Sequence, residues 1–296
     1  MTMPDFLLLG AAKAGSTTLQ YVLSQHPQIF MCPVKESGFF WAYGEDQNFE
    51  GADIEKFKHR IVNKIDHYQA LFADITTEKV IGEASVRYLS HPKSPKNIHH
   101  FIPNARLLVI LRQPADRAFS SFSHNLRDGI ETNEDFATAL LEERQGLRDR
   151  WVSRKYLAKG RYFENLSRYL EMFDQDQLHI SLFDDLKSNP LDFAKRIFNF
   201  LDVDDSFVPD MSHRHNASGI IRNPILRFLW TRSGKLRVAI RPLMPQKTGH
   251  HLFEWLSRDL KRTTFSVELR RELTEYYRQD IEQLQDLIDR DLSNWL

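Results

Sequence analysis

The chain has 296 residues, of which 42% are hydrophobic, and its 40 basic side chains balance its 40 acidic ones. A formal net charge of zero excludes a global field that recruits nucleic acid or an anionic membrane, so any anion recognition must be local. A single cysteine, Cys32, excludes an intrachain disulfide framework, and no segment approaches the roughly 18 consecutive apolar residues of a membrane span. We therefore expect a soluble cytoplasmic protein in which Cys32 is a small buried hydrophobic residue.

The first predicted elements are a strand, a loop and a helix. The apolar run at 5–9 predicts a core strand, and residues 16–25 predict a helix because apolar residues recur on one face. Between them lies a loop of small residues that contains Lys13. A strand that leads through a glycine turn into a helix directs backbone N–H groups and the positive end of the helix dipole at one point. This segment therefore predicts a binding site for phosphate or another anion.

Further along the chain, short apolar strands alternate with helical stretches. The remaining predicted strands cover 79–84, 105–112 and 177–183. The predicted helices cover 53–62, 114–128, 134–145, 161–173 and 190–201, and the pattern from 225 onward is helical and charged. Such alternation indicates parallel strands joined by crossover helices. The expected fold class is α/β, a P-loop-like parallel sheet flanked by helices, with a helix-rich C-terminal third.

The chain length and the absence of internal repeats favour a single domain over residues 1–296. In this interpretation the core sheet occupies about 1–203, and a loop followed by a helical region occupies about 204–296. The stretch 203–224 holds two prolines and a glycine, and it is the best candidate for a long functional loop.

The lysine of the first loop stands at an unusual place for a phosphate-binding loop. The Walker fingerprint places lysine directly after its second glycine, where this chain has Ser16, whereas the lysine here comes earlier, at Lys13. Ser16, Thr17 and Thr18 add hydroxyl donors, although Thr17 or Thr18 also suits a plain helix cap. A strand, turn and helix without a ligand account for the glycines and threonines but not for the Lys13 cation.

A second motif, LVILRQPADRAFSSF, distinguishes between types of nucleotide. In nucleoside triphosphatases of this fold a later strand typically ends in an aspartate that helps to hold Mg²⁺, but this strand ends in Arg112. A guanidinium is a planar fork suited to phosphate oxygens, and Ser120 lies two turns into the following helix. A surface arginine at a strand end is the simpler alternative. Together the two motifs predict an adenosine-type ligand with phosphates at two separated places.

We expect no metal site. Histidines cluster at 99–100, 213–215 and 250–251. No cysteine or carboxylate completes a recognisable ligand spacing around them, as a zinc site requires.

The two phosphate motifs resemble those of sulfotransferases that use 3′-phosphoadenosine 5′-phosphosulfate (PAPS). Within that superfamily the chain is similar to the branch that contains heparan sulfate N- and 3-O-sulfotransferases and their bacterial relatives, and the likeness extends along most of the chain. The resemblance implies that Lys13 contacts the transferring sulfuryl group and its bridging oxygen. It assigns Arg112 and Ser120 to the 3′-phosphate. The residues that it assigns to the 5′-phosphate are Ala14, Gly15, Ser16, Thr17 and Thr18.

The resemblance also implies a catalytic base. VKESGFFW is similar to the family segment in which a glutamate removes the acceptor proton, and that glutamate falls on Glu36. His124 falls where the N-sulfotransferase branch has an active-site histidine, so it is the competing proton acceptor. The simpler alternatives are a solvated Lys–Glu pair and a histidine that is hydrogen-bonded on a helix face.

Two further segments resemble the family. GEASVRYLSHP is similar to an acceptor-side segment, although Ala84 stands where some relatives carry a lysine. Its matching positions are Glu83, Ser85 and Tyr88. RHNASGIIRNP is similar to a loop that closes over the cofactor in bacterial relatives, although a glycine turn with a surface arginine accounts for it too. Its matching positions are Ser218, Gly219 and Arg222.

The function implied by the resemblance is transfer of a sulfuryl group from PAPS to a hydroxyl or amine, with adenosine 3′,5′-bisphosphate (PAP) as the second product. Carbohydrates are the favoured acceptors, and glycolipids and small hydroxylated metabolites are the others. Two alternatives share the phosphate loop, namely a metal-dependent nucleotide kinase or NTPase and a non-catalytic PAPS-binding protein. The kinase predicts lysine at position 16 and a carboxylate near 112, which this chain lacks.

Overall fold

The core of the protein is a five-stranded parallel sheet. The computed structural model describes residues 2–45, 58–148, 153–212, 220–221, 260–261 and 265–296. The strands, in order across the sheet, are β2 (Ile29–Met31), β3 (Val80–Ala84), β1 (Phe6–Gly10), β4 (Arg106–Leu111) and β5 (Leu178–Leu182). All four neighbouring pairs are parallel. A separate antiparallel pair consists of β6 (Ile220–Ile221) and β7 (Leu260–Lys261). The expected α/β class with a parallel sheet is confirmed.

Four of the five strands of this sheet match the predicted ones to within one residue at each end. The fifth, β2, was not predicted, because three residues are too short to show a periodicity. Only the structure identifies β2 as a strand, through its pairing with β3, in which Ile29 lies opposite Val80 and Met31 lies opposite Gly82.

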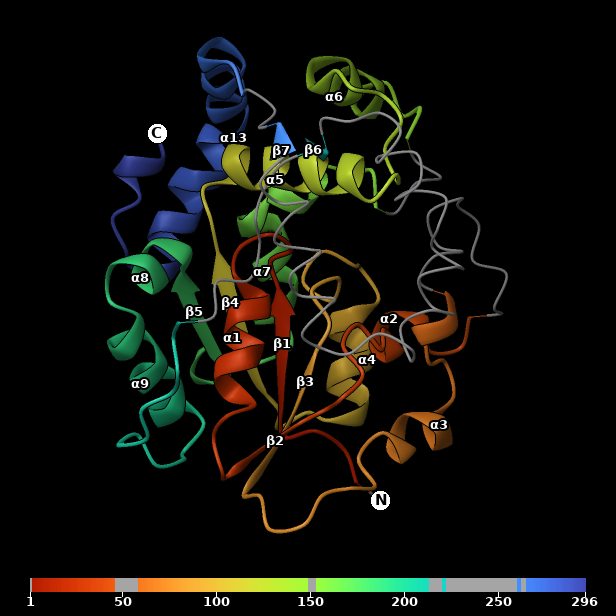
Figure 1. Cartoon of the computed structure of the whole chain (residues 1–296), viewed down its shortest axis with the longest axis vertical. Coiled ribbons are helices and arrows are strands. Elements are labelled where there is room, and N and C mark those ends of the chain that lie inside the picture. Colours follow the sequence, from red (N-terminus) through yellow and green to blue (C-terminus); the bar gives the residue numbers. More distant parts are fainter. Residues whose placement is uncertain (1, 46–57, 149–152, 213–219, 222–259, 262–264) are drawn as a thin grey trace.

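Helices surround the sheet on both faces and across its carboxyl edge. The α-helices are α1 (Ser16–Leu23), α2 (Phe39–Ala42), α3 (Ile65–Ala70), α4 (Ser94–Phe101), α5 (Pro114–Arg127), α6 (Phe136–Arg144), α7 (Tyr162–Leu170), α8 (Phe183–Ser188), α9 (Pro190–Phe200) and α13 (Val267–Ile288). Short 3-10 helices are η2 (Lys58–Arg60), η3 (Ala158–Gly160), η4 (Gln175–Gln177) and η6 (Ser293–Trp295). In Figure 1 the strand arrows point toward α5, so the carboxyl ends of the strands gather beneath that helix. None of the described helices combines the length and apolar character that a membrane crossing requires.

Most of the predicted helices are found where the pattern places them, as α1, α5, α6, α7 and α9. The predicted helix at 53–62 is wrong in its described part, because only Lys58–Arg60 form a turn, of 3-10 type, and its side chains are not buried. Residues 53–57 lie outside the described residues. The short helices α2, α3, α4 and α8 were not predicted, because four to eight residues offer too few repeats of a helical pattern.

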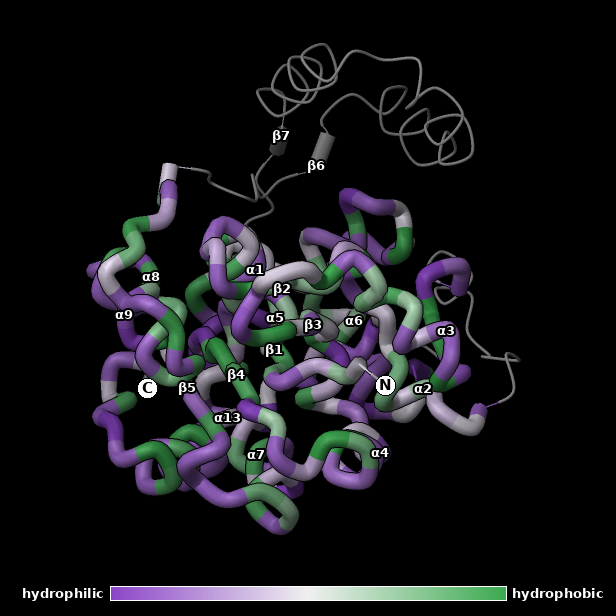
Figure 2. Tube along the Cα trace, turned by 90° about the horizontal axis from the view of Figure 1, so that it is seen from below, coloured by the Kyte–Doolittle hydropathy of each residue, from purple (hydrophilic) through white to green (hydrophobic). Residues whose placement is uncertain are grey.

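The hydrophobic core follows the central strands. β1 is buried along its whole length, and the hydrophobic colour in Figure 2 concentrates along β1 and β4. Cys32 is buried next to this core, as expected, and burial raises the pKa of its thiol to about 12. The last residues of the chain join the same core: the Gln113 side chain donates hydrogen bonds to Thr274 Oγ1 and to the Trp295 carbonyl, both at 3.1 Å. The end of the chain thus packs directly against the start of α5.

Candidate active site

The loop between β1 and α1 has the backbone that an anion site needs. Gly15 precedes the helix with φ of 106°, and a Cβ there would lie 3.0 Å from the Phe183 ring, so only glycine fits. Lys13 also has a positive φ, 68°, which turns the chain sharply within the loop. No side chain caps the N-terminus of α1. The first N–H groups of α1 therefore lack a side-chain acceptor, and the helix-cap alternative for Thr17 and Thr18 is not what the structure shows.

This loop opens into a cavity of about 510 Å³ at the carboxyl edge of the sheet. Residues from several distant segments line it. The predicted site residues among them are Lys13, Gly15, Ser16, Thr17, Thr18, Glu36, Arg112, Ser120 and His124. The cavity therefore brings both phosphate motifs and both candidate bases together. Its position agrees with the rule that ligands of parallel α/β sheets bind at the carboxyl ends of the strands.

Arg112 lies beside the phosphate loop because β4 is paired with β1. Its guanidinium donates a long hydrogen bond of 3.4 Å to the Lys13 carbonyl and lies 5.1 Å from the centre of the Phe183 ring. The Tyr162 hydroxyl donates to the Arg112 carbonyl at 2.8 Å and fixes the backbone at the strand end. Most of the guanidinium N–H groups thus have no acceptor among these contacts, and the guanidinium lines the cavity.

The cavity is electropositive at the phosphate loop. Burial, together with the positive charges of Arg127, Arg112 and Lys35, lowers the pKa of Lys13 to about 8. Lys35 reaches the same place from the loop after β2, and its ammonium donates to Thr17 Oγ1 at 2.8 Å. A lysine whose protonation is disfavoured by neighbouring positive charges is stabilised when an anion binds beside it.

Glu36 is the carboxylate among the described residues that line the cavity. It lies in a left-handed conformation with φ of 62°, and its N–H donates to the Ala84 carbonyl at 2.9 Å. Its Oε1 accepts a hydrogen bond from the Val86 N–H at 3.2 Å. Burial raises the pKa of Glu36, while the Val86 hydrogen bond and the nearby Lys35 act in the opposite direction. A desolvated carboxylate that lines a cavity has the properties of a general base.

His124 lines the same cavity but is held by its own helix. The Arg127 guanidinium donates to Nδ1 at 2.6 Å, which leaves the ring proton on Nε2, 3.4 Å from Asp128 Oδ2. Burial and the charge of Lys13 lower the pKa of His124 to about 4. At neutral pH the imidazole is therefore uncharged, and its acceptor nitrogen is already occupied.

The three predicted acceptor residues lie behind Glu36 and do not line the cavity. Ser85 Oγ donates to Glu83 Oε1 at 2.5 Å and accepts from the Gly38 N–H at 3.2 Å. The Tyr88 hydroxyl accepts from the Phe40 N–H at 3.4 Å. All three side chains are fully buried, and burial raises the pKa of Glu83 to about 7. Ser85 and Tyr88 thus accept hydrogen bonds from the backbone of the segment that follows Glu36, and Glu83 accepts one from Ser85.

The other predicted residues have different placements. Ala14 is buried, does not line the cavity, and uses its N–H to donate to the Ala11 carbonyl at 3.2 Å. The predicted cofactor-covering positions Ser218, Gly219 and Arg222 lie outside the described residues, as do the histidines of 213–215 and 250–251. Within the described ranges, no three His, Cys, Asp or Glu side chains come together as a metal site.

The cavity also contains residues that sequence reasoning missed. These include Lys35, Arg87, Lys159 and Phe183. Phe183 directly follows β5, so the rule that ligands bind at the carboxyl ends of parallel strands gives a signal for it. Lys35 is adjacent to Glu36 in the sequence, which is a second signal. Lys159 reaches the cavity from η3, and no local pattern predicts that placement.

Comparison with known proteins agrees with this geometry. The sulfotransferase from Alicyclobacillus acidocaldarius has a crystal structure that matches with a TM-score of 0.78 and 30% identity, and the match covers 100% of this chain and 99% of that one. The bifunctional heparan sulfate N-deacetylase/N-sulfotransferase 1 of Caenorhabditis elegans is 29% identical over 205 residues, which cover 68% of this chain and 22% of that protein. The membrane-associated sulfotransferase kil1 of Dictyostelium discoideum is 24% identical over 284 residues, which cover 69% of this chain and 57% of that protein.

The chain thus spans about a fifth of the length of the first of these curated relatives and somewhat more than half of the second. A family model described as the sulfotransferase domain matches residues 3–287, which is nearly the whole chain. The resemblance predicted from the two phosphate motifs is confirmed, and the chain belongs to the sulfotransferase domain family.

Proposed function

We propose that this chain is an enzyme that transfers a sulfuryl group from PAPS to a hydroxyl or amine of an acceptor. The observation that carries the proposal is the cavity in which the phosphate loop, with Lys13, lies beside Arg112 and Ser120. A cation at each of two separated places matches a nucleotide with a phosphosulfate at one end and a phosphate on its ribose. Membership of the sulfotransferase domain family supports the same assignment.

The residues present fit PAPS. The N–H groups at the start of α1, together with Ser16, Thr17 and Thr18, offer donors for the 5′-phosphate. Arg112 and Ser120 hold the 3′-phosphate in this proposal. When bound, PAPS supplies the sulfuryl group and leaves as PAP. The predicted covering positions Ser218, Gly219 and Arg222 complete the cofactor site in the proposal.

In the proposed reaction Glu36 is the base and Lys13 is the electrophilic cation. The bond from sulfur to the bridging oxygen breaks as the bond from sulfur to the acceptor forms, and the acceptor proton passes to the Glu36 carboxylate. Lys13 stabilises the negative charge that develops on the bridging oxygen. Glu36 is favoured over His124 because the acceptor nitrogen of His124 already receives a hydrogen bond from Arg127. His124 is left with an Nε2–H that donates to an oxygen.

The proposed acceptor is a carbohydrate, with a glycolipid or small hydroxylated metabolite as the other candidates. The heparan sulfate enzymes among the relatives support a sugar acceptor. The part of the cavity near Glu36 supports it too, because Trp41, Arg87 and Ser90 line it with an aromatic ring, a cation and a hydroxyl. We further propose that the chain acts in the cytoplasm, where a single buried thiol such as Cys32 stays reduced.

The proposal is tested by the affinity for two nucleotides. In Arg112→Ala we expect the affinity for PAP to fall about tenfold to a hundredfold, because a charged hydrogen bond contributes about 1.5–3 kcal/mol. The affinity for AMP, which lacks the 3′-phosphate, should stay nearly the same. Isothermal titration calorimetry in EDTA-containing buffer measures both ligands, and MgATP, titrated in a separate buffer without EDTA, serves as the ligand for the kinase alternative. Equal losses for PAP and AMP, or tighter binding of MgATP than of PAPS by the wild type, contradict the proposal.

Catalysis needs a separate measurement. Labelled PAPS is incubated with a panel of glycans, glycolipids and hydroxylated metabolites, and transfer of the label is recorded. Tight PAP binding without transfer to any acceptor favours the non-catalytic alternative.

A further inference from the structure

Lys35 connects two walls of the cavity. It belongs to the loop after β2, while its hydrogen-bond partner, Thr17, belongs to the first turn of α1. Its ammonium is 2.8 Å from Thr17 Oγ1, and both residues line the cavity. The contact places a cation at the N-terminal end of a helix, where the dipole already favours an anion.

Within the described part of the chain, the Lys35 ammonium forms no ion pair. No carboxylate of the described residues lies within ion-pair distance of it, and the Thr17 hydroxyl uses one of its three donors. Burial lowers the pKa of Lys35, and the charge of Glu36 raises it. A partly desolvated cation with two free donors is stabilised when an anion occupies the space beside it.

Lys35 and Lys13 approach that space from different segments. Lys13 comes from the phosphate loop and Lys35 from the loop that carries Glu36. Since Thr17 is the second residue of α1, the Lys35 ammonium lies at the first turn of that helix, where its N–H groups gather. The side chain that follows Lys35 is the proposed base, so one short segment supplies both a cation for the leaving group and an acceptor for the proton.

We propose that Lys35 is a further catalytic residue, which binds the 5′-phosphate of the cofactor and neutralises the charge that this phosphate gains as the sulfur–oxygen bond breaks. The inference rests on the proposed sulfotransferase function. The broken bond leaves its electron pair on the bridging oxygen of PAP, and the acceptor proton goes to Glu36, so Lys35 neither gains nor loses a proton. Lys13 acts at the bridging oxygen, and Lys35 acts at the phosphate.

The test compares two nucleotides that differ at the 5′ position. In Lys35→Met, which keeps the length and loses the charge, we expect PAP to bind about tenfold to a hundredfold more weakly, as for a lost charged hydrogen bond. Adenosine 3′-monophosphate, which lacks the 5′-phosphate, should bind within about twofold of the wild type. Lys35→Arg should recover part of the PAP affinity, because it restores the charge. Under saturating PAPS, kcat of Lys35→Met should also fall.

The control is Lys79→Met, which removes the same charge from the surface, where Lys79 pairs with Asp202 at 2.9 Å. Its PAP affinity should equal that of the wild type. If Lys35→Met weakens both nucleotides equally, or only lowers the melting temperature, Lys35 is a structural tie to Thr17 and the inference is overturned. Unchanged PAP affinity in Lys35→Met overturns it too. Failure of the wild type to bind PAP is a different result, because it contradicts the proposed function itself.

Discussion

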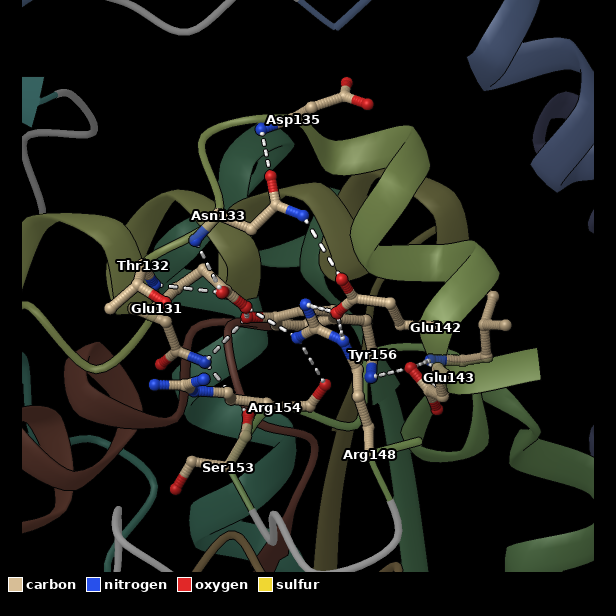
Figure 3. Close-up of polar contacts among 12 residues, drawn as sticks. Glu131, Thr132, Asn133, Asp135, Glu142, Glu143, Arg148, Ser153, Arg154 and Tyr156 are labelled. Carbon is tan, nitrogen blue, oxygen red and sulfur yellow. Dashed lines mark hydrogen bonds and ion pairs between the residues drawn. The ribbon is translucent and has the colours of Figure 1, made fainter. Parts of the chain in front are cut away.

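Two groups of carboxylates that are buried or half-buried lie at or near the cavity, and they differ in how their charge is compensated. Glu36 and Glu83 lie on the side of β3, and neither has an ion-pair partner among the described residues. Glu131 lies beyond α5, where Arg148 NH1 is 2.6 Å from its Oε2 and the Tyr156 hydroxyl donates to the same oxygen at 2.8 Å. Figure 3 shows the side chains of Glu131, Arg148 and Tyr156 converging on one another.

As a consequence, the pKa values of the two groups are shifted in opposite directions. Burial raises the pKa of Glu36 and of Glu83, and the nearby donors do not reverse it. Burial also acts to raise the pKa of Glu131, but hydrogen bonds from Arg148, Asn133 and Tyr156 outweigh it and lower the net value. Burial alone therefore does not distinguish a reactive carboxylate from a structural one. The distinction is the presence of a paired cation, since an unpaired carboxylate remains able to take up a proton near neutral pH.

The network around Glu131 nevertheless serves the cavity indirectly. Arg148 also binds Glu142 at 2.6 Å, and Asn125, which lines the cavity, donates to the Tyr156 hydroxyl at 3.1 Å and to the Ser153 carbonyl at 2.9 Å. Ser153 lines the cavity as well. The paired carboxylate thus holds a wall of the site in place, whereas of the two unpaired ones Glu36 lines the cavity where chemistry is proposed.

The largest expected effect is on catalysis, and it tests the unpaired carboxylate Glu36. Glu36→Gln should lower kcat by about 10²–10⁴, which is the usual contribution of a positioned base, because glutamine cannot take up the acceptor proton. Cofactor affinity should stay within a few-fold of the wild type. Steady-state kinetics with labelled PAPS measures kcat, and His124→Ala is the matched variant for the competing base. If Glu36→Gln turns over nearly as fast as the wild type while His124→Ala is inactive, the base is His124.

The next-largest effect is on the stability of the fold, and it tests the carboxylate that is paired with Arg148. Arg148→Met leaves Glu131 buried without its cation and should lower the free energy of unfolding by about 3–5 kcal/mol, as for other broken buried ion pairs. Denaturant unfolding followed by circular dichroism measures it. Arg144→Met is the matched control, because Arg144 forms an exposed ion pair with Glu272 at 2.9 Å and should change stability by less than about 1 kcal/mol. Equal effects of the two variants contradict the distinction between the two groups.

Local sequence pattern was sufficient for one wall of the site. The strand that ends at Gly10 and the strand that ends at Leu111 are both mostly apolar, and residues that line the cavity follow each of them within two positions. Parallel strands end at the same edge of the sheet, and the pairing of β1 with β4 in the structure brings the two motifs side by side there.

The rest of the site depends on contacts between distant segments, which a local pattern does not record. Glu83, Ser85 and Tyr88 were expected on the acceptor side, but all three are buried. Ser85 and Tyr88 accept hydrogen bonds from the backbone after Glu36, and Glu83 accepts one from Ser85. The pairing of β2 with β3 brings these segments together. Lys35 drew notice only as a neighbour of Glu36, yet its ammonium contacts Thr17, 18 residues away. The buried pairing of Glu131 with Arg148 spans 17 residues and likewise has no short-range signal.

The smallest effect, on the pH dependence of stability, contrasts the two groups directly. The folded-state pKa of Glu83 is about 7, whereas an unfolded glutamate titrates with a pKa of about 4.3. Below that lower pH both states are protonated, and as pH rises toward 7 the unfolded state releases its proton first. The stability of the wild type should therefore fall by about 3 kcal/mol across this window, relative to Glu83→Gln, which cannot titrate.

Glu131 should give the reverse result, because its pKa is lowered in the folded protein. Its contribution is present above the unfolded pKa and is lost as pH falls, so relative to Glu131→Gln the wild type should gain stability with rising pH. Unfolding curves of the wild type and both variants from pH 4 to pH 8 give the two differences. Glutamine keeps an oxygen that accepts from Ser85 in place of Glu83, so Glu83→Gln is expected to fold. Parallel curves for the wild type and Glu83→Gln would mean that Glu83 is solvated or paired after all, and the contrast between the two groups would then rest on Glu36 alone.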